Sequence, residues 1–271
     1  MLTFVPTPIG NLGDISFRTI EVLKDSELIL CEDTRVTKKL IHLISDKYQI
    51  SFPNFEFISL HSHNEKQFLN DENKDILQSK NVVYLSDAGM PCVSDPGSFL
   101  VDFCLKEKID YDVLPGSNAI LTAYASSGFD DTSFSFFGFL PHKGDKRKDK
   151  LDEIMNNDNL AIVYESPHRL LKLLEEIKIK DNKREVFLVK ELTKKFQTRY
   201  KDNIDNLYEL LKKETIKGEW VVIIKPKVKQ NSGVITYDDI KDLNLPPKQK
   251  AKLIAKLTGE NIKDIYNDLI S

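Results

Sequence analysis

The sequence predicts an α/β protein built mainly on a parallel sheet with helices on both faces. Short apolar strands alternate with amphipathic helical segments through the first half of the 271-residue chain. Turns rich in Gly and Pro follow these strands directly. The second half also mixes strands with helices. We therefore expect two α/β domains, residues 1–138 and 139–228, followed by a linker and helical tail at 229–271.

Composition narrows the class of protein. The formal net charge of −3 argues against binding nucleic acid through a uniformly basic surface, so such contacts must come from local patches. The three cysteines, Cys31, Cys92 and Cys104, form no CxxC pair, which fits a reduced, cytoplasmic protein. No signal segment and no membrane span is expected, because no apolar run approaches about 18 residues.

The first half is expected to contain five strands. They are residues 2–6, 28–31, 55–60, 82–85 and 111–114. Apolar stripes identify the helices between them. Thr34 is predicted to cap the second helix, and residues 64–78 are predicted to form one helix. Side chains predicted to face inward are Phe17, Ile20, Val22 or Leu23, Leu40, Ile41, Ile44, Phe99, Leu100 and Phe103.

The second half begins with an aromatic strand and a basic, turn-rich segment. The predicted strands are residues 133–139, 160–164, 185–190 and 219–225, and the basic segment is residues 141–150. Ser166 as N-cap and Pro167 at the first helical position predict a helix start. A further helix is expected at 203–213.

The tail contains two short helical patterns. In the first, which begins after Pro246 and Pro247, the side chains expected inward are Leu253, Ile254 and Leu257. Gly259 is placed to end it as a C-cap.

Four loops that follow strands share a composition of Gly, Pro and a few polar residues. They read PIGNLGD, LSDAGMPCVSDPG, LPGSNA and YESPHR. Because open α/β sheets bind ligands at the carboxyl ends of their strands, we expect these loops to line a cofactor site, although each alone could be a tight connection. Neither GxGxxG nor GxxxxGK[ST] is present, which disfavours a dinucleotide site or a P-loop.

Metal and covalent chemistry have little support. His61 and His63 lack further residues at metal-ligand spacing, so no metal site is expected. Ser117 lacks the GxSxG elbow, and Cys92 has no evident base. A transferase that mainly aligns two substrates fits these residues better.

Eight separated motifs within residues 1–225 resemble the tetrapyrrole methylase superfamily, in its ribosomal RNA-modifying branch. They are VPTPIGNLGDISFRTIEVL, CEDTRVTKKL, LSDAGMPCVSDPG, VLPGSNAILTAYASSG, GFLPHKGDKR, YESPHRL, KELTKKFQ and GEWVVII. The resemblance implies two α/β domains with S-adenosylmethionine in the cleft between them, and a homodimer. It also implies methylation of the ribose 2′-hydroxyl of a cytidine in the decoding region of 16S rRNA, in the small ribosomal subunit.

The resemblance also implies site residues. The cofactor-binding set is Pro8, Ile9, Asp87, Gly89, Met90, Asn118, Ala119, Tyr164 and Ser166. The motifs EDTR and KELTK would lie near the acceptor, and the catalytic candidates are Glu32, Arg35, Lys190 and Glu191. This chain departs from the family pattern in having Gln197 in place of Glu, Lys190 in place of Arg and Met90 in place of Thr.

Methyl transfer to a ribose hydroxyl is an in-line displacement. The hydroxyl needs a nearby base or a cation that favours its deprotonated form. We expect Glu191 or Lys190 nearest the hydroxyl, with Arg35 and Arg169 orienting phosphate or ribose. The alternative is that EDTR and KELTK form only a structural ion-pair network.

RNA contacts are expected from a basic patch and from the lysine-rich tail. The patch consists of Lys143, Lys146, Arg147 and Lys148. Both segments could instead be ordinary solvated faces. Two other functions stay open: a methyltransferase acting on a small molecule such as a tetrapyrrole, and a non-catalytic RNA- or nucleotide-binding protein.

Overall fold

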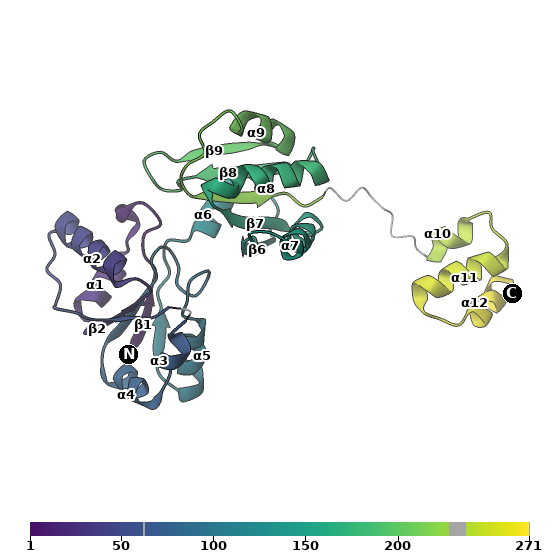
Figure 1. Cartoon of the computed structure of the whole chain (residues 1–271). Coiled ribbons are helices and arrows are strands. Elements are labelled where there is room, and N and C mark those ends of the chain that lie inside the picture. The colour runs from purple at the N-terminus through teal and green to yellow at the C-terminus, as the bar shows by residue number, and fades with distance from the viewer. Residues whose placement is uncertain (62, 228–236, 271) are drawn as a thin grey trace. The chain divides into compact units, whose positions relative to one another are not determined.

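The computed structural model describes residues 1–61, 63–227 and 237–270 (Figure 1). The chain forms two compact units, Met1–Pro226 and Lys227–Ser271. The first unit contains two five-stranded sheets, and helices accompany both. The predicted α/β class is therefore confirmed.

The first sheet is parallel throughout, with strand order β3-β2-β4-β1-β5. Its strands are β1 (Leu2–Val5), β2 (Leu28–Cys31), β3 (Glu56–Ser59), β4 (Val82–Leu85) and β5 (Tyr111–Val113). Strand β4 lies between β2 and β1. Its loop therefore leaves from the middle of the sheet, where loops from neighbouring strands can meet.

Helices cover both faces of this sheet. They are α1 (Phe17–Lys24), α2 (Thr34–Tyr48), α3 (Glu65–Phe68), α4 (Asp71–Ser79) and α5 (Ser98–Glu107). Alternate strand residues enter two separate cores: Tyr84 packs with α3, α4 and α5, whereas Val83 packs with α1 and α2 (Figure 1). The central strands are apolar at almost every position because both of their faces are buried.

The second sheet is mixed, with strand order β6-β7-β10-β8-β9. Its strands are β6 (Phe134–Phe139), β7 (Leu160–Glu165), β8 (Glu185–Lys190), β9 (Thr198–Asn203) and β10 (Trp220–Ile224). Only β6 and β7 run parallel. Helix α6 (Ala119–Ser127) packs in the core on one face, and α7 (Asp145–Met155), α8 (Pro167–Lys180) and α9 (Ile204–Leu211) pack in the core on the other.

The second unit has three described helices, α10 (Tyr237–Asp242), α11 (Pro247–Thr258) and α12 (Ile262–Ile270). They enclose a small core of Ile240, Ala251, Ile254 and Ile265. Helix α11 ends where Gly259 adopts the left-handed conformation, so the predicted C-cap is confirmed.

Two helix starts differ from the sequence prediction. Asp33 caps α2, since its side chain accepts a hydrogen bond from the backbone N–H of Arg35, so the choice of Thr34 is wrong. A carboxylate suits this position because it also faces the positive end of the helix dipole. The single helix predicted at 64–78 is divided, because the Asn70 side chain accepts a hydrogen bond from the N–H of Asn73 and caps a new helix.

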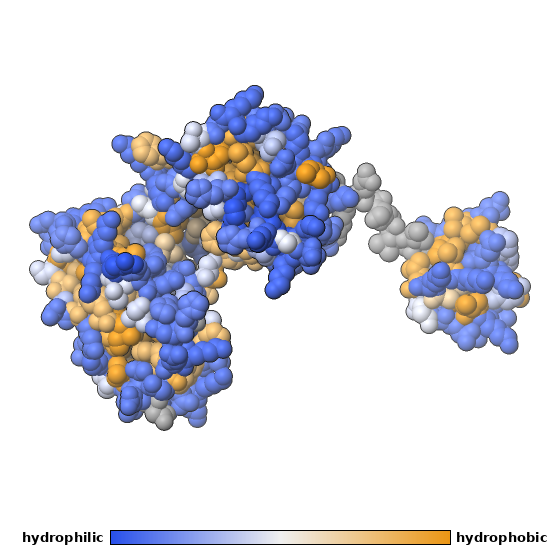
Figure 2. Space-filling view, in the orientation of Figure 1, coloured by the Kyte–Doolittle hydropathy of each residue, from blue (hydrophilic) through white to orange (hydrophobic). Residues whose placement is uncertain are grey.

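Several side chains predicted to face inward lie at the surface. Phe17 is 84% exposed and Phe99 46% exposed. In α5 the buried pair is Leu100 and Cys104, four residues apart, which leaves Phe99 beside the core. Leu253 and Leu257 are exposed as well, because α11 turns Ala251 and Ile254 inward. Figure 2 shows hydrophobic surface of this kind interrupted by hydrophilic residues.

Strand β9 was not predicted, and its sequence TRYKDN explains why. The strand is mostly exposed and lies at the edge of the sheet, so no buried apolar face marks it.

Residues 141–150 are partly helical, because α7 begins at Asp145. Strand β6, which the sequence assigned mainly to the first domain, pairs with β7 in the second sheet. The boundary at 138/139 stays a prediction.

The loop from β4 to α5 is held from beneath by two buried side chains. Tyr84 donates its hydroxyl to the carbonyl of Pro96 at 2.7 Å. Glu65, only 2% exposed, accepts hydrogen bonds from the backbone N–H groups of Gly97 at 3.0 Å and Leu100 at 3.1 Å. A side chain from α3 thus caps the start of α5.

Within the described residues, no helix is both long and apolar enough to cross a membrane.

Replacing Glu65 by Ala should destabilise the protein by about 1–3 kcal/mol, because two buried N–H groups would be left without an acceptor. Urea unfolding of the variant measures the change. Glu21→Ala, which removes an exposed carboxylate from α1, is the matched control and should change stability little. Equal stability of the two variants would refute the capping role of Glu65.

Candidate active site

A cavity of about 400 Å³ lies among the strand-end loops of the first sheet and one end of the second. Most residues predicted to bind the cofactor line it: Ile9, Gly89, Met90, Asn118, Ala119, Tyr164 and Ser166. Pro8 and Asp87 are not among the lining residues, although each adjoins one in sequence. The volume falls within the range of about 300–1,000 Å³ that small-molecule sites occupy.

The loops after β1 and β4 are joined by backbone pairing. Thr7 and Gly89 each donate an N–H to the other's carbonyl at 3.0 Å. Gly89 has φ +84, and an added Cβ would lie 3.0 Å from Cγ2 of Ile9. Glycine therefore serves both conformation and close approach here. The hydroxyl of Ser86 donates to the carbonyl of Gly89 at 2.7 Å and fixes the loop further.

The amino end of α6 also borders the cavity. Asn118 caps this helix, and its side-chain oxygen accepts from the N–H of Leu121 at 3.0 Å. The preceding turn passes close to the first strand loop, since a Cβ on Gly116 would lie 2.3 Å from Cγ of Pro6. Glycine at position 116 thus allows close packing where the two loops meet.

Aromatic side chains form part of the wall supplied by the second sheet. Tyr164 and Phe139 lie with ring centroids 5.5 Å apart, and Trp220 also lines the cavity. Burial, together with the negative charge of Asp95, raises the pKa of Tyr164 to about 12. These rings offer apolar faces to a flat ligand.

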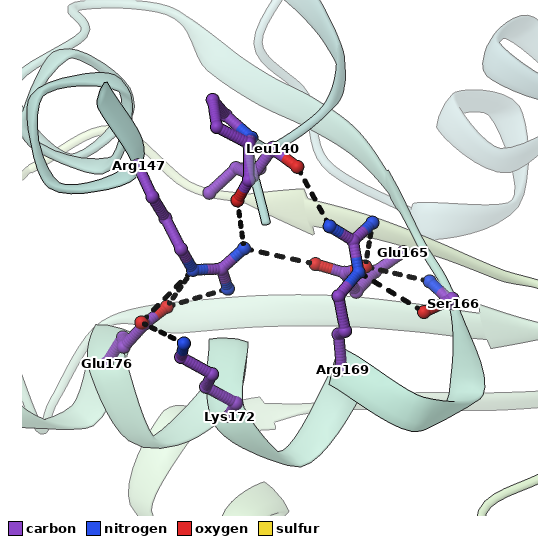
Figure 3. Close-up of polar contacts among 8 residues, drawn as sticks. Leu140, Arg147, Glu165, Ser166, Arg169, Lys172 and Glu176 are labelled. Atoms are coloured by element: carbon purple, nitrogen blue, oxygen red, sulfur yellow. Dashed lines mark hydrogen bonds and ion pairs between the residues drawn. The ribbon is translucent and has the colours of Figure 1, made fainter. Parts of the chain in front are cut away.

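A buried ion network stabilises this wall (Figure 3). Nη2 of Arg169 lies 2.7 Å from Oε1 of Glu165, and Nη1 of Arg147 lies 3.8 Å from Oε2 of the same carboxylate. Arg147 also pairs with Glu176 at 2.7 Å and donates to the carbonyl of Pro141 at 3.0 Å. Arg169 donates to the carbonyl of Leu140 at 2.9 Å. The network therefore joins the segment after β6 to the end of β7 and the start of α8.

The network changes the assignment of two arginines. Arg147 was expected to contact RNA phosphate, but it is only 2% exposed, so that prediction is wrong. Its guanidinium is instead required to balance buried carboxylates. Arg169 was expected to orient phosphate or ribose; its side chain is 16% exposed and contacts Glu165.

The four predicted catalytic residues lie outside the cavity lining. Glu191 accepts hydrogen bonds from the N–H of Glu219 at 2.9 Å and from Lys194 at 3.1 Å. The N–H of Glu219, followed by Lys194, lowers the pKa of Glu191. Lys190 lies over the ring of Trp220 at 5.9 Å. Glu191 thus belongs to an ion-pair network that holds the KELTK turn to the start of β10.

Gln197 has a defined structural place in that turn. Its side-chain oxygen accepts from the N–H of Thr193 at 2.6 Å. The amide oxygen at this position thus makes a backbone contact of the kind that a carboxylate oxygen also makes.

The EDTR segment brings carboxylates to the ends of β2 and β4. Two side-chain hydrogen bonds join Arg35 to Asp33, with the shorter at 2.7 Å, and they lower the pKa of Asp33 to about 2. Burial, then the charge of Asp87, raises the pKa of Glu32. Asp87 accepts from the N–H of Asp33 at 3.3 Å, and burial raises its pKa. In the described chain, no three His, Cys, Asp or Glu are grouped so as to hold a metal ion.

Asp95 is a cavity residue that the sequence prediction missed. Burial, with the charges of Glu32 and Asp87, raises its pKa to about 6. It lies within the loop 85–97 that the sequence singled out, but its position beside Pro96 and Gly97 suggested only a turn. The sequence pattern therefore marked the loop as part of a site but did not mark Asp95 within it.

Comparisons with known proteins agree with this architecture. The model of the family Tetrapyrrole (Corrin/Porphyrin) Methylases matches residues 1–208. The chain is 49% identical to "Ribosomal RNA small subunit methyltransferase I" of Campylobacter fetus subsp. fetus, with 100% of each chain covered. It is 44% identical to a protein of the same name from Helicobacter pylori, with 98% of this chain and 96% of that protein covered.

A solved structure shows the same fold. Uroporphyrin-III C-methyl transferase from Thermus thermophilus, complexed with S-adenyl homocysteine, matches with a TM-score of 0.55 at 15% identity, covering 82% of this chain and 96% of that one. Because the family model spans most of this chain and the named relatives match it nearly end to end, the chain belongs to the tetrapyrrole methylase family.

Proposed function

We propose that this protein transfers a methyl group from S-adenosylmethionine to the ribose 2′-hydroxyl of a cytidine in the decoding region of 16S rRNA. The observation that carries the proposal is the 49% identity, over the full length of both chains, to a protein named for methylation of small-subunit ribosomal RNA. The cavity at the strand ends supports it independently, since loops there provide the site where α/β sheets bind ligands.

The cavity residues fit the donor. The residues proposed to hold it are the lining members of the predicted set, Ile9, Gly89, Met90, Asn118, Ala119, Tyr164 and Ser166, with Pro8 and Asp87 supporting them from adjacent positions. Aromatic and apolar faces suit an adenine ring. The described lining residues include no Lys, Arg or His, which suits a positively charged ligand. When bound, the donor supplies an electrophilic methyl group.

The protein's main contribution is alignment of the two reactants and exclusion of water. The hydroxyl proton must leave as the new O–C bond forms. Glu32, Arg35, Lys190 and Glu191 remain our proposed catalytic set near the acceptor. Within it, the raised pKa of Glu32 makes that carboxylate a stronger base, and the lowered pKa of Glu191 makes it a weaker one. We therefore assign Glu32 as base and Glu191 to positioning.

Recognition of the RNA is assigned to local basic groups. Lys143, Lys146 and Lys148 are exposed around the start of α7, and α11 contributes Lys248, Lys252 and Lys256. These lysines can neutralise phosphates although the whole chain is weakly acidic. We further propose that the protein acts in the cytoplasm as a homodimer and meets its RNA in the small ribosomal subunit.

Methyl transfer from labelled S-adenosylmethionine should place label on 16S rRNA, at the ribose of a single cytidine. The assay offers 30S subunits, isolated 16S RNA and small tetrapyrroles in parallel, and the labelled RNA is mapped by nuclease digestion. Label on a tetrapyrrole would instead support the small-molecule alternative. Donor binding without transfer to any acceptor would favour a non-catalytic role.

Glu32→Gln should lower kcat at least about tenfold, and by a larger factor than it lowers donor affinity, because the base is removed. Glu191→Gln should act mainly by loosening the turn that contacts Glu219, and so raise KM more than it lowers kcat. The control is Glu21→Gln on the exposed side of α1. Full activity of Glu32→Gln would remove the assignment of Glu32.

Replacing Lys143, Lys146 and Lys148 together by Gln should weaken RNA binding. It should also reduce the slope of log affinity against log salt by about one for each phosphate that the protein no longer neutralises. The control replaces Lys24, Lys106 and Lys213, which are exposed elsewhere. Binding is measured by fluorescence anisotropy at several salt concentrations. An unchanged slope would show that this patch is only solvated surface.

A further inference from the structure

The ionised side chains that face the cavity are acidic, and they differ in whether their charge is balanced. The carboxyl groups that line it belong to Asp95, Glu165 and Glu219. Glu165 is paired with Arg169, and Glu219 is paired with Lys194 at 2.8 Å. Asp95 has no hydrogen bond or ion pair with any described residue. Its charge is therefore the unbalanced one.

The neighbours of Asp95 add negative charge. The charge of Glu32, which follows β2, and that of Asp87, which follows β4, both raise the pKa of Asp95. Three other titratable groups feel the charge of Asp95, which raises the pKa of each: Tyr84 on β4, Cys92 in the same loop and Tyr164 on β7. A half-buried carboxylate among other carboxylates is electrostatically unfavourable until a cation approaches.

We propose that Asp95 recognises a positive charge of the methyl donor, either its sulfonium or its α-ammonium group. The inference rests on the proposed function, in which S-adenosylmethionine occupies this cavity. A ribose hydroxyl could also donate to Asp95, but it would leave the surplus negative charge in place, whereas a cation compensates it. A metal ion is a poor alternative, because the described residues group no set of three suitable ligands.

This role links donor binding to the ionisation of Asp95. The pKa of Asp95 lies near 6 without a bound cation, and a cation that favours the charged carboxylate lowers it. Donor binding at pH 6 should therefore release up to about half a proton from this group, and binding at pH 8 should release almost none from it. Glu32 and Asp87 also have raised pKa values and share in the effect, so the contribution of Asp95 is the part that its substitution removes.

Titration calorimetry on the full chain with three probes tests the proposal. S-adenosylmethionine carries both cations, S-adenosylhomocysteine keeps only the ammonium, and 5′-methylthioadenosine has neither. Asp95→Asn should weaken S-adenosylmethionine at least about tenfold, as expected when one charged interaction is removed, and methylthioadenosine less than about twofold. If the substitution weakens the binding of S-adenosylhomocysteine by the same factor, Asp95 recognises the ammonium group. If the binding of S-adenosylhomocysteine is unchanged, Asp95 recognises the sulfonium.

The matched control is Asp102→Asn, which removes an exposed carboxylate from α5 that pairs with Lys106 at 2.6 Å. It should leave the affinity of all three probes unchanged. Repeating the pH 6 titration in two buffers of different ionisation enthalpy counts the released protons, and Asp95→Asn should reduce that count. Thermal unfolding confirms that each variant is folded.

A second measurement needs no variant. Between pH 7 and pH 5 the affinity of the unaltered protein for S-adenosylmethionine should fall about tenfold, as Asp95 gains a proton, while that for methylthioadenosine stays constant. Equal weakening of all three probes by Asp95→Asn would overturn the proposal, as would unchanged S-adenosylmethionine binding. If the unaltered protein binds no S-adenosylmethionine, the proposed function fails with it.

Discussion

The site depends on one backbone contact, the pairing of Thr7 with Gly89. Strands β1 and β4 are neighbours in a parallel sheet, so their loops leave from the same edge. Paired N–H and carbonyl groups then hold the two loops together, and only glycine allows the close approach to Ile9. Loop 85–97 is thereby fixed at its start, and Tyr84 and Glu65 fix its end. A preorganised loop can hold a ligand without first being ordered.

The two walls of the cavity treat buried carboxylates differently. On the second sheet, Glu165 is fully buried but contacts Arg147 and Arg169, so its charge is balanced and its function is structural. On the first, Asp95 is half-buried beside two other acids and has no counter-ion within the described residues. The contrast separates a carboxylate that maintains the fold from one left available to a ligand.

Much of the fold could be predicted because a strand buried on both faces is recognisable in the sequence as a short run of apolar residues. Strands β1, β2 and β4 of the first sheet are short, fully buried and mostly apolar runs, and all five strands of that sheet lie within a few residues of their predicted positions. Strand β9 carries no such signal, since its polar side chains are solvated and only pairing with β8 makes it a strand. Phe99 was misplaced for a related reason: helical periodicity marks an apolar stripe but does not choose which flank is covered.

The sequence by itself determined the alternation of strands and helices, the Gly- and Pro-rich loops and the family motifs, because these are local patterns that a single segment can carry. Only the tertiary structure decided which side chains meet. It placed Arg147 in the interior, assigned Glu191 to a turn and brought Asp95 to the cavity. The physical reason is that the burial and the charge balance of a side chain depend on neighbours distant in sequence. The residue type alone does not specify which neighbours those are.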